Sequence, residues 1–131
     1  MYKRIAVFTI LLLLVFSFIY SNDILSKSER EYIDNKGVIV FVGDTNYPPF
    51  YFVNKNNDID GMTVELLRWI ATELKLNIEF IHTPLAEGRE AVQSGEADIL
   101  CDFFYSINRD STFDFTIPIC DVPAYIYVKT D

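Results

Sequence analysis

The chain has 131 residues, a net charge of −8 and a hydrophobic content of 50%. This length suits one domain better than two. The excess of acidic residues argues against a nucleic-acid or anionic-membrane partner, because both bind basic surfaces. The single histidine and the lack of metal-ligand spacing predict no metal and no cofactor.

The N-terminus has the pattern of an export signal. Lys3 and Arg4 precede an almost wholly apolar run that ends at Ile19, as in a secretory signal peptide. We therefore predict a signal peptide over residues 1–21. Because Ile19 is larger than the residue usual before a cleavage site, the alternative is an N-terminal anchor formed by residues 5–20. In both cases the rest of the chain is expected to be exported, on the periplasmic or extracytoplasmic face of the membrane.

An apolar run from Val38 to Gly43 predicts the first strand. The run is unbroken, which indicates burial on both faces, as in a parallel sheet. A polar N-terminal helix is expected before it, over residues 22–36. The turn "DTNYPPFYF", Asp44 to Phe52, follows the strand, and we expect its Phe50 and Phe52 rings to pack in the core.

A loop and a long helix come next. Asn54 to Gly61 is rich in amide, acid and glycine residues, which is typical of a hairpin tip. Met62 to Leu76 is predicted as a helix that Thr63 could cap, with Trp69 at its flank. The apolar stripe of this helix consists of Met62, Leu66, Leu67, Ile70, Ala71 and Leu74.

The remaining segments continue the alternation of strand and helix. Strands are predicted over Asn77–His82 and Ala97–Cys101, with a helix over Pro84–Ser94 between them, and a last strand over Ala124–Lys129. This order predicts an α/β fold, a three-layer sandwich in which helices cover both faces of a mostly parallel sheet.

The two cysteines, Cys101 and Cys120, each lie in an apolar stretch. An exported protein can form a disulfide, and that alternative stays open. The apolar surroundings favour two buried thiols.

The candidate binding residues follow the ends of the predicted strands. Ligands of open α/β sheets bind beyond the carboxyl ends of the strands, where Asp44, Tyr47 and the loop with Arg109 are expected to meet. Arg109 offers a planar set of donors for a carboxylate, Tyr47 a flat ring, and Asp44 an acceptor for an ammonium group. Together they would suit a zwitterion such as an amino acid. The alternatives are an Arg109 that pairs with Asp110 or Asp114, a Tyr47 packed in the core, and an Asp44 that caps the turn.

Enzyme signals are weak. The sequence has no nucleophile motif, no certain carboxylate pair and no glycine-rich phosphate loop. We therefore predict a binding protein rather than an enzyme.

Four stretches in this order resemble the bacterial extracellular solute-binding proteins of family 3, the polar-amino-acid-binding type. They are "VGDTNYPPF", "DGMTVELLRWIATEL", "EAVQSGEADIL" and "SINRDSTFDFTIP". The resemblance covers residues 37–131. It implies the first lobe of a type II periplasmic-binding-protein fold, in which two α/β lobes close on the ligand. The second lobe would be missing from this chain.

The resemblance also implies roles for single residues. Arg109 matches the arginine that grips the ligand carboxylate, and Tyr47 the tyrosine that stacks on the ligand. Asp44 matches an acid that touches the ligand side chain or ammonium group. Ser106 opens the motif that carries Arg109 and completes the expected ligand-binding set.

Three departures from the family pattern weaken the expected site. Leu85 replaces an aromatic residue that would form one wall around the ligand, and Thr63 replaces an acid in the signature helix. The sequence stops at Asp131, where the family chain crosses into the second lobe. We therefore expect residues 22–131 alone to bind amino acids poorly.

Three functions remain open. The leading one is a solute-binding protein for ABC-type uptake, with a small amino-acid-like ligand and, as partner, an inner-membrane permease or a second lobe. The alternative is the extracellular sensor domain of a membrane histidine kinase or diguanylate cyclase, because "LSKSE" before the first strand resembles the helix that precedes such domains. A dehydratase-type enzyme of the same fold ranks third.

Overall fold

The computed structural model describes residues 24–129. The predicted signal peptide or anchor lies outside these residues. Within them, no helix is both long enough and apolar enough to cross a membrane.

A short capped helix, α2 (Lys27–Lys36), begins the described chain. Its start is a capping box, in which the Ser26 hydroxyl accepts the Glu29 N–H and the Glu29 carboxylate accepts the Ser26 N–H at 2.7 Å. At its other end, Lys36 forms an ion pair of 2.7 Å with Asp98. The predicted polar helix is confirmed and begins at Lys27.

Replacing Ser26 by alanine is expected to fray α2. The change removes one half of the capping box, which contributes about 1 kcal/mol to a helix. Hydrogen exchange of the α2 amides should therefore speed up roughly fivefold. Asn35→Ala is the control, because Asn35 is exposed and lies inside α2, near the end opposite the cap. Equal effects of the two substitutions would contradict the capping role.

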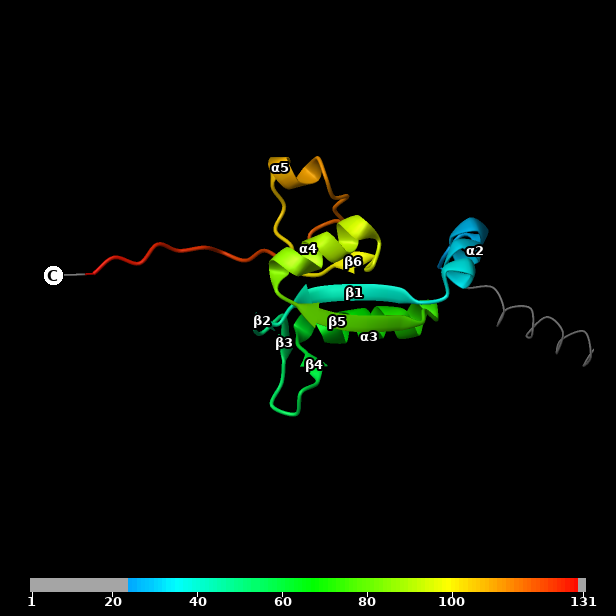
Figure 1. Ribbon diagram of the computed structural model, residues 1–131, viewed down its shortest axis with the longest axis horizontal. Helices are drawn as coiled ribbons and strands as arrows, with labels where there is room; N and C mark the ends of the chain where they lie inside the picture. The colour runs from blue at the N-terminus through cyan, green and yellow to red at the C-terminus, as the bar shows by residue number, and fades with distance from the viewer. Residues whose placement is uncertain (1–23, 130–131) are drawn as a thin grey trace, which may run out of the picture.

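A parallel sheet forms the centre of the fold (Figure 1). Its strands lie in the order β5 (Ile78–Thr83), β1 (Ile39–Asp44) and β6 (Ile99–Leu100). In the register, Phe41 faces Phe80 on one side and Ile99 on the other. Because the strands are parallel, their carboxyl ends share one edge, which we call the ligand edge.

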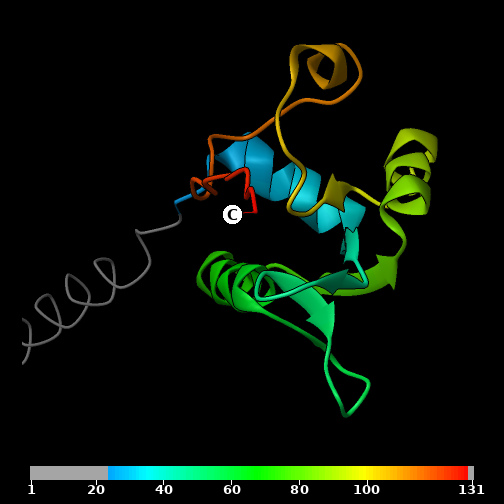
Figure 2. The same ribbon diagram turned by 90° about the vertical axis from the view of Figure 1, so that its left-hand side faces the viewer.

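Two helices cover opposite faces of this sheet (Figure 2). On the side of α3 (Met62–Leu74), the core contains Phe41, Tyr51, Val64 and Cys101. On the side of α4 (Leu85–Ser94), it contains Val42, Ala91 and Ala97. Neighbouring residues of β1 therefore point into different core layers, and the predicted three-layer α/β sandwich is confirmed.

A second, antiparallel sheet follows β1. It consists of β2 (Asn46–Tyr47), β3 (Tyr51–Val53) and β4 (Ile59–Asp60), with a cis bond between Pro48 and Pro49. The predicted hairpin tip over residues 54–61 is confirmed for residues 54–58, which connect β3 and β4, whereas Ile59 and Asp60 form β4 itself.

The aromatic residue of this turn that packs in the core is Tyr51, and not Phe50 or Phe52 as predicted. Phe50 and Phe52 are only half-buried, whereas Tyr51 between them is fully buried. The Tyr51 hydroxyl donates to the Ile81 carbonyl at 2.7 Å. This bond explains why a tyrosine can take the central position, because a buried hydroxyl needs a partner.

The predicted cap of α3 is also wrong. Gly61 holds the cap position with a φ of 128°, and the Thr63 hydroxyl donates to Asp102 instead. Met62, assigned to the apolar stripe, is exposed, whereas Val64 is fully buried. Trp69 is exposed at the helix flank.

The last part of the described chain leaves the body of the domain. After β6 the chain forms a short helix, α5 (Ile107–Asp110), and then an extended arm without helix or strand (Figure 1). The strand predicted over residues 124–129 is therefore wrong. Its alternating apolar side chains have no neighbouring strand among the described residues, and Ile126 is 95% exposed.

Both cysteines are free thiols. Cys101 is buried in the core, and burial raises its pKa to about 12. Cys120 lies on the extended arm and is exposed. The preference for thiols over a disulfide is confirmed, but the predicted burial of Cys120 is wrong.

Candidate functional site

Asp44 ends β1 at the ligand edge. Its carboxylate accepts the backbone N–H of Asn46 at 3.2 Å. It therefore caps the turn, as one alternative predicted. Within residues 24–129 this carboxylate makes no other hydrogen bond, so it keeps acceptor capacity for a further partner.

Tyr47 joins two loops of the ligand edge. Its ring stacks on Phe50 with 5.4 Å between centroids and meets the edge of Phe104 at 6.4 Å. Phe104 belongs to the loop after β6, which we call the arginine loop (residues 102–116). The turn that follows β1 and the arginine loop are therefore in contact through these rings.

Arg109 lies in α5, within the arginine loop. Its Nη1 donates to the Phe104 carbonyl at 2.7 Å, and its Cζ lies 4.2 Å from the centroid of the Phe103 ring. Within residues 24–129, no ion pair joins Arg109 to Asp110 or Asp114. The alternative, in which Arg109 pairs with a neighbouring acid, is therefore wrong.

Ser106 is the residue before α5. Its backbone carbonyl accepts the N–H groups of Arg109 and Asp110 at 2.9 and 3.0 Å. Its hydroxyl makes no capping bond. Ser106 thus fixes the turn that carries Arg109 through its backbone, and the hydroxyl is left for other partners.

The structure brings three of the four predicted residues into one arrangement. Tyr47 contacts Phe104, the Phe104 carbonyl holds Arg109, and the carbonyl of Ser106 accepts the Arg109 amide. Asp44 lies close along the chain, at the end of β1. Sequence reasoning missed Phe104, although the run of aromatic residues before Ser106 was a signal that this loop carries exposed rings.

Asp102 is a second residue that sequence reasoning missed. It follows β6 with a left-handed φ of 53°, and its Oδ1 accepts the Thr63 hydroxyl at 2.7 Å. Its Oδ2 is buried and has no hydrogen-bond partner in the described part of the chain. Burial raises the pKa of Asp102, and the bond from Thr63 opposes this only in part. The bond links the start of α3 to the start of the arginine loop.

Replacing Asp102 by asparagine is expected to stabilise the fold increasingly as pH rises. The native pKa of Asp102 is raised, so its contribution to stability is complete below the unfolded value of about 3.9. It is lost as pH rises through the native pKa. Asparagine keeps an acceptor for Thr63 and tolerates a left-handed backbone, but it cannot ionise.

Urea unfolding of the native protein and of Asp102→Asn from pH 3.5 to 7 tests this prediction. The other carboxylates contribute equally to both proteins, so their contributions cancel in the difference between the two unfolding free energies. Asp110→Asn, in the same loop and exposed, is the control. A pH-independent difference for Asp102→Asn would contradict the assignment.

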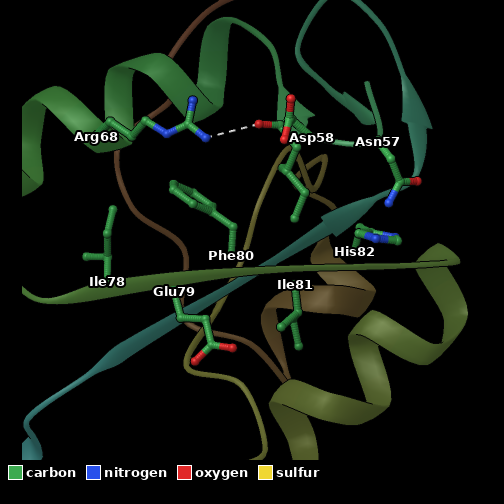
Figure 3. Close-up of a pocket in the computed structure, with 9 residues that line it drawn as sticks. Asn57, Asp58, Arg68, Ile78, Glu79, Phe80, Ile81 and His82 are labelled. Carbon is green, nitrogen blue, oxygen red and sulfur yellow. Dashed lines mark hydrogen bonds between the residues drawn. The ribbon is translucent and has the colours of Figure 1, made fainter. Parts of the chain in front are cut away.

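A hollow of about 700 Å³ is lined by β5, as far as His82 near its carboxyl end, and by residues of the β3–β4 hairpin (Figure 3). It runs along β5 beneath the β3–β4 hairpin, where Arg68 donates to the Ile59 carbonyl and lies over Phe80. Because the hollow is open and contains none of the predicted binding residues, we assign it no role. Its lining residues are Asn57, Asp58, Ile59, Arg68, Ile78, Glu79, Phe80, Ile81 and His82.

Residues 24–129 contain no group of three or more acidic, histidine or cysteine side chains that could hold a metal ion. The four predicted residues at the ligand edge offer an aromatic ring, a guanidinium, a hydroxyl and a carboxylate. This set suits a small organic molecule with a carboxylate and an apolar or cationic part.

Comparison with protein families decides the relationship. Residues 39–131 match the family described as bacterial extracellular solute-binding proteins, family 3. The chain belongs to this family. The predicted resemblance is thus confirmed, and the family places such domains outside the cytoplasm. Among curated proteins, none matches the chain.

Solved structures of the same fold come from two kinds of protein. The substrate-binding protein AbpA of an amino acid ABC transporter from Streptococcus pneumoniae, bound to L-arginine, is 33% identical, with a TM-score of 0.60; the match covers 67% of this chain and 39% of AbpA. A histidine kinase sensor domain with similarity to periplasmic binding proteins is 37% identical, with a TM-score of 0.59; the match covers 60% and 35%.

A third structure adds a link to enzymes. An ancestral amino-acid-binding protein, described as a precursor of cyclohexadienyl dehydratase, is 28% identical, with a TM-score of 0.59; the match covers 67% of this chain and 40% of that one. The chain thus spans well under two-thirds of the length of each of these three structures, as expected for a single lobe of a bilobed fold.

Proposed function

We propose that residues 37–131 form the first lobe of an extracytoplasmic receptor that binds a small amino-acid-like molecule for ABC-type uptake. The single observation that carries this proposal is the position of the Arg109 side chain at the ligand edge. Its guanidinium is held by the Phe104 carbonyl and has no acidic partner among the described residues. A positive group that the fold orients but does not neutralise suits a carboxylate ligand.

The other residues take complementary roles in this proposal. The Tyr47 ring, fixed by Phe50 and Phe104, offers a surface for the apolar part of the ligand. Asp44 has acceptor capacity for an ammonium group, and the Ser106 hydroxyl can add a hydrogen bond to the carboxylate. An inner-membrane permease is the proposed partner, and export by the N-terminal segment would bring the lobe to it.

One lobe covers a ligand on one side only. A pocket that leaves much of the ligand in water binds weakly. We therefore infer that tight binding needs a second lobe, on the same or another chain.

Calorimetry of the full chain with L-arginine, L-glutamine and L-glutamate tests the proposal. We expect dissociation constants in the millimolar range for at least one of them. Micromolar binding would contradict the need for a second lobe. The absence of binding at the highest soluble amino-acid concentration would contradict the ligand-binding function itself. Unchanged NMR signals of Tyr47 and Phe104 would confirm that absence.

A sensor domain of a membrane histidine kinase or diguanylate cyclase is the second candidate. Two observations favour it, the capped helix α2 directly before β1 and the likeness to a histidine kinase sensor domain. The intact mass and the membrane association of the native product discriminate between the two. A membrane-bound species much larger than this chain would favour the sensor, and a soluble exported species would favour uptake.

Catalysis is the weakest candidate. The family and the structures compared are mainly binding proteins. We expect no turnover of prephenate or arogenate by the full chain, and measurable turnover would reverse this assignment.

A further inference from the structure

The guanidinium of Arg109 rests on an aromatic ring. Its Cζ lies 4.2 Å from the centroid of the Phe103 ring, well within the range of a cation–π contact. The adjacent residue holds the same group from another direction, since the Phe104 carbonyl accepts from Nη1. Two consecutive residues therefore hold the guanidinium, Phe103 through its ring and Phe104 through its carbonyl.

Phe103 is itself held in place by rings from the far side of the arginine loop. Phe113 meets it edge-on with 5.3 Å between centroids, and Phe115 stacks on it at 5.9 Å with an interplanar angle of 11°. The backbone closes the loop, because the carbonyl of Arg109 accepts the N–H of Phe113 at 2.9 Å. The loop thus has a small aromatic core of its own, to which Phe103 is central.

Arg109 contacts an aromatic ring and not an acidic side chain. Asp110 and Asp114 are close to Arg109 in the sequence, yet neither forms an ion pair with it among the described residues. The ring attracts the cation without using its N–H donors. Apart from Nη1, the donors of Arg109 have no partner in the described chain, which leaves Nε and Nη2 for a planar oxyanion.

We propose that Phe103 is a positioning residue for ligand binding, which orients the Arg109 guanidinium so that its free donors receive the carboxylate of the ligand. An arginine side chain has many rotamers, and fixing it before the ligand arrives lowers the entropic cost of binding. Phe103 would act only through Arg109 and would not touch the ligand. The part that concerns binding rests on the proposed function, whereas the orientation of Arg109 does not.

NMR of the full chain tests the orientation without a ligand. In the native protein, the δ-methylene and Nε–H protons of Arg109 should show ring-current shifts. Phe103→Leu should remove these shifts, and Phe103→Tyr should retain them. Tyr105→Leu is the matched control, because Tyr105 contacts Phe115 in the same loop and not Arg109.

Titration of the same four proteins with L-arginine and L-glutamine tests the effect on binding. We expect Phe103→Leu to weaken binding roughly threefold to tenfold, with Phe103→Tyr and Tyr105→Leu close to the native protein. Lost ring-current shifts with unchanged affinity would overturn the positioning role and leave the proposed function standing. If the native protein binds none of L-arginine, L-glutamine and L-glutamate, the proposed function fails, and the NMR comparison still decides whether Phe103 orients Arg109. Native shifts in Phe103→Leu would refute that orientation.

Discussion

Replacing Gly43 by alanine is expected to destabilise the fold by about 3 kcal/mol, the upper end of the usual range for overpacking a core. A Cβ at this position of β1 would lie 2.6 Å from ring atoms of Tyr51. Tyr51 is fully buried, and its hydroxyl is tied to the Ile81 carbonyl. The ring therefore cannot retreat without breaking a buried hydrogen bond. Urea unfolding of the full chain, followed by circular dichroism, measures the effect.

Gly88→Ala is the matched control for this prediction. Gly88 lies inside α4, and an added Cβ would come no closer than 3.3 Å to Leu100 and Val42. The small crowding is offset by the better helix propensity of alanine, which contributes up to about 1 kcal/mol. We therefore expect a change within about 1 kcal/mol of zero. Similar losses at both glycines would show that the clash with Tyr51 is not the cause.

A double-mutant cycle assigns the loss to one pair of residues. Tyr51→Leu alone removes a buried ring and is destabilising. In the double variant the alanine at position 43 no longer meets the ring, so the two losses should not add. Additive losses would mean that the methyl group disturbs β1 by another route.

The layers of the fold could be predicted because parallel strands and amphipathic helices have strong local patterns. The unbroken run of β1 predicted a strand between two helix layers, and Phe41 and Val42 point into these two layers. The extended arm could not be predicted in the same way. Its alternating apolar residues satisfy the pattern of a strand, but a strand also needs a neighbour with which to pair, and the pattern of a segment contains no information about that neighbour.

The candidate site was predictable in position and not in detail. That Tyr47 and the arginine loop meet follows from the shared edge of parallel strands. The contacts that hold Arg109 do not follow, because cation–π contacts and carbonyl acceptors depend on loop geometry rather than on periodicity. For the same reason Asp102 was missed, since its bond to Thr63 joins residues that are distant in the sequence.

Replacing Arg109 by alanine is expected to weaken ligand binding roughly 100-fold. Hydrogen bonds to a charged group contribute about 1.5–3 kcal/mol, and the carboxylate would lose the charged partner that the proposed site gives it. Arg109→Lys keeps the charge but loses the planar donors, so its loss should be intermediate. Titrations with L-arginine and L-glutamine, followed by the NMR signals of Tyr47 and Phe104, compare both variants with the native chain. Because native binding is expected to be millimolar, Arg109→Ala should show no saturation.

Arg68→Ala provides the matched control, because Arg68 also contacts a backbone carbonyl and an aromatic ring, but in another part of the fold. It donates to the Ile59 carbonyl and lies over the Phe80 ring at 5.5 Å, beside the hollow along β5. If a carbonyl and a ring were enough to make an arginine important for binding, both substitutions would weaken it. We expect only Arg109→Ala to do so, because Arg109 lies at the ligand edge and contacts Phe104, whose ring meets Tyr47. Weaker binding in Arg68→Ala with native binding in Arg109→Ala would move the site from the ligand edge to the hollow.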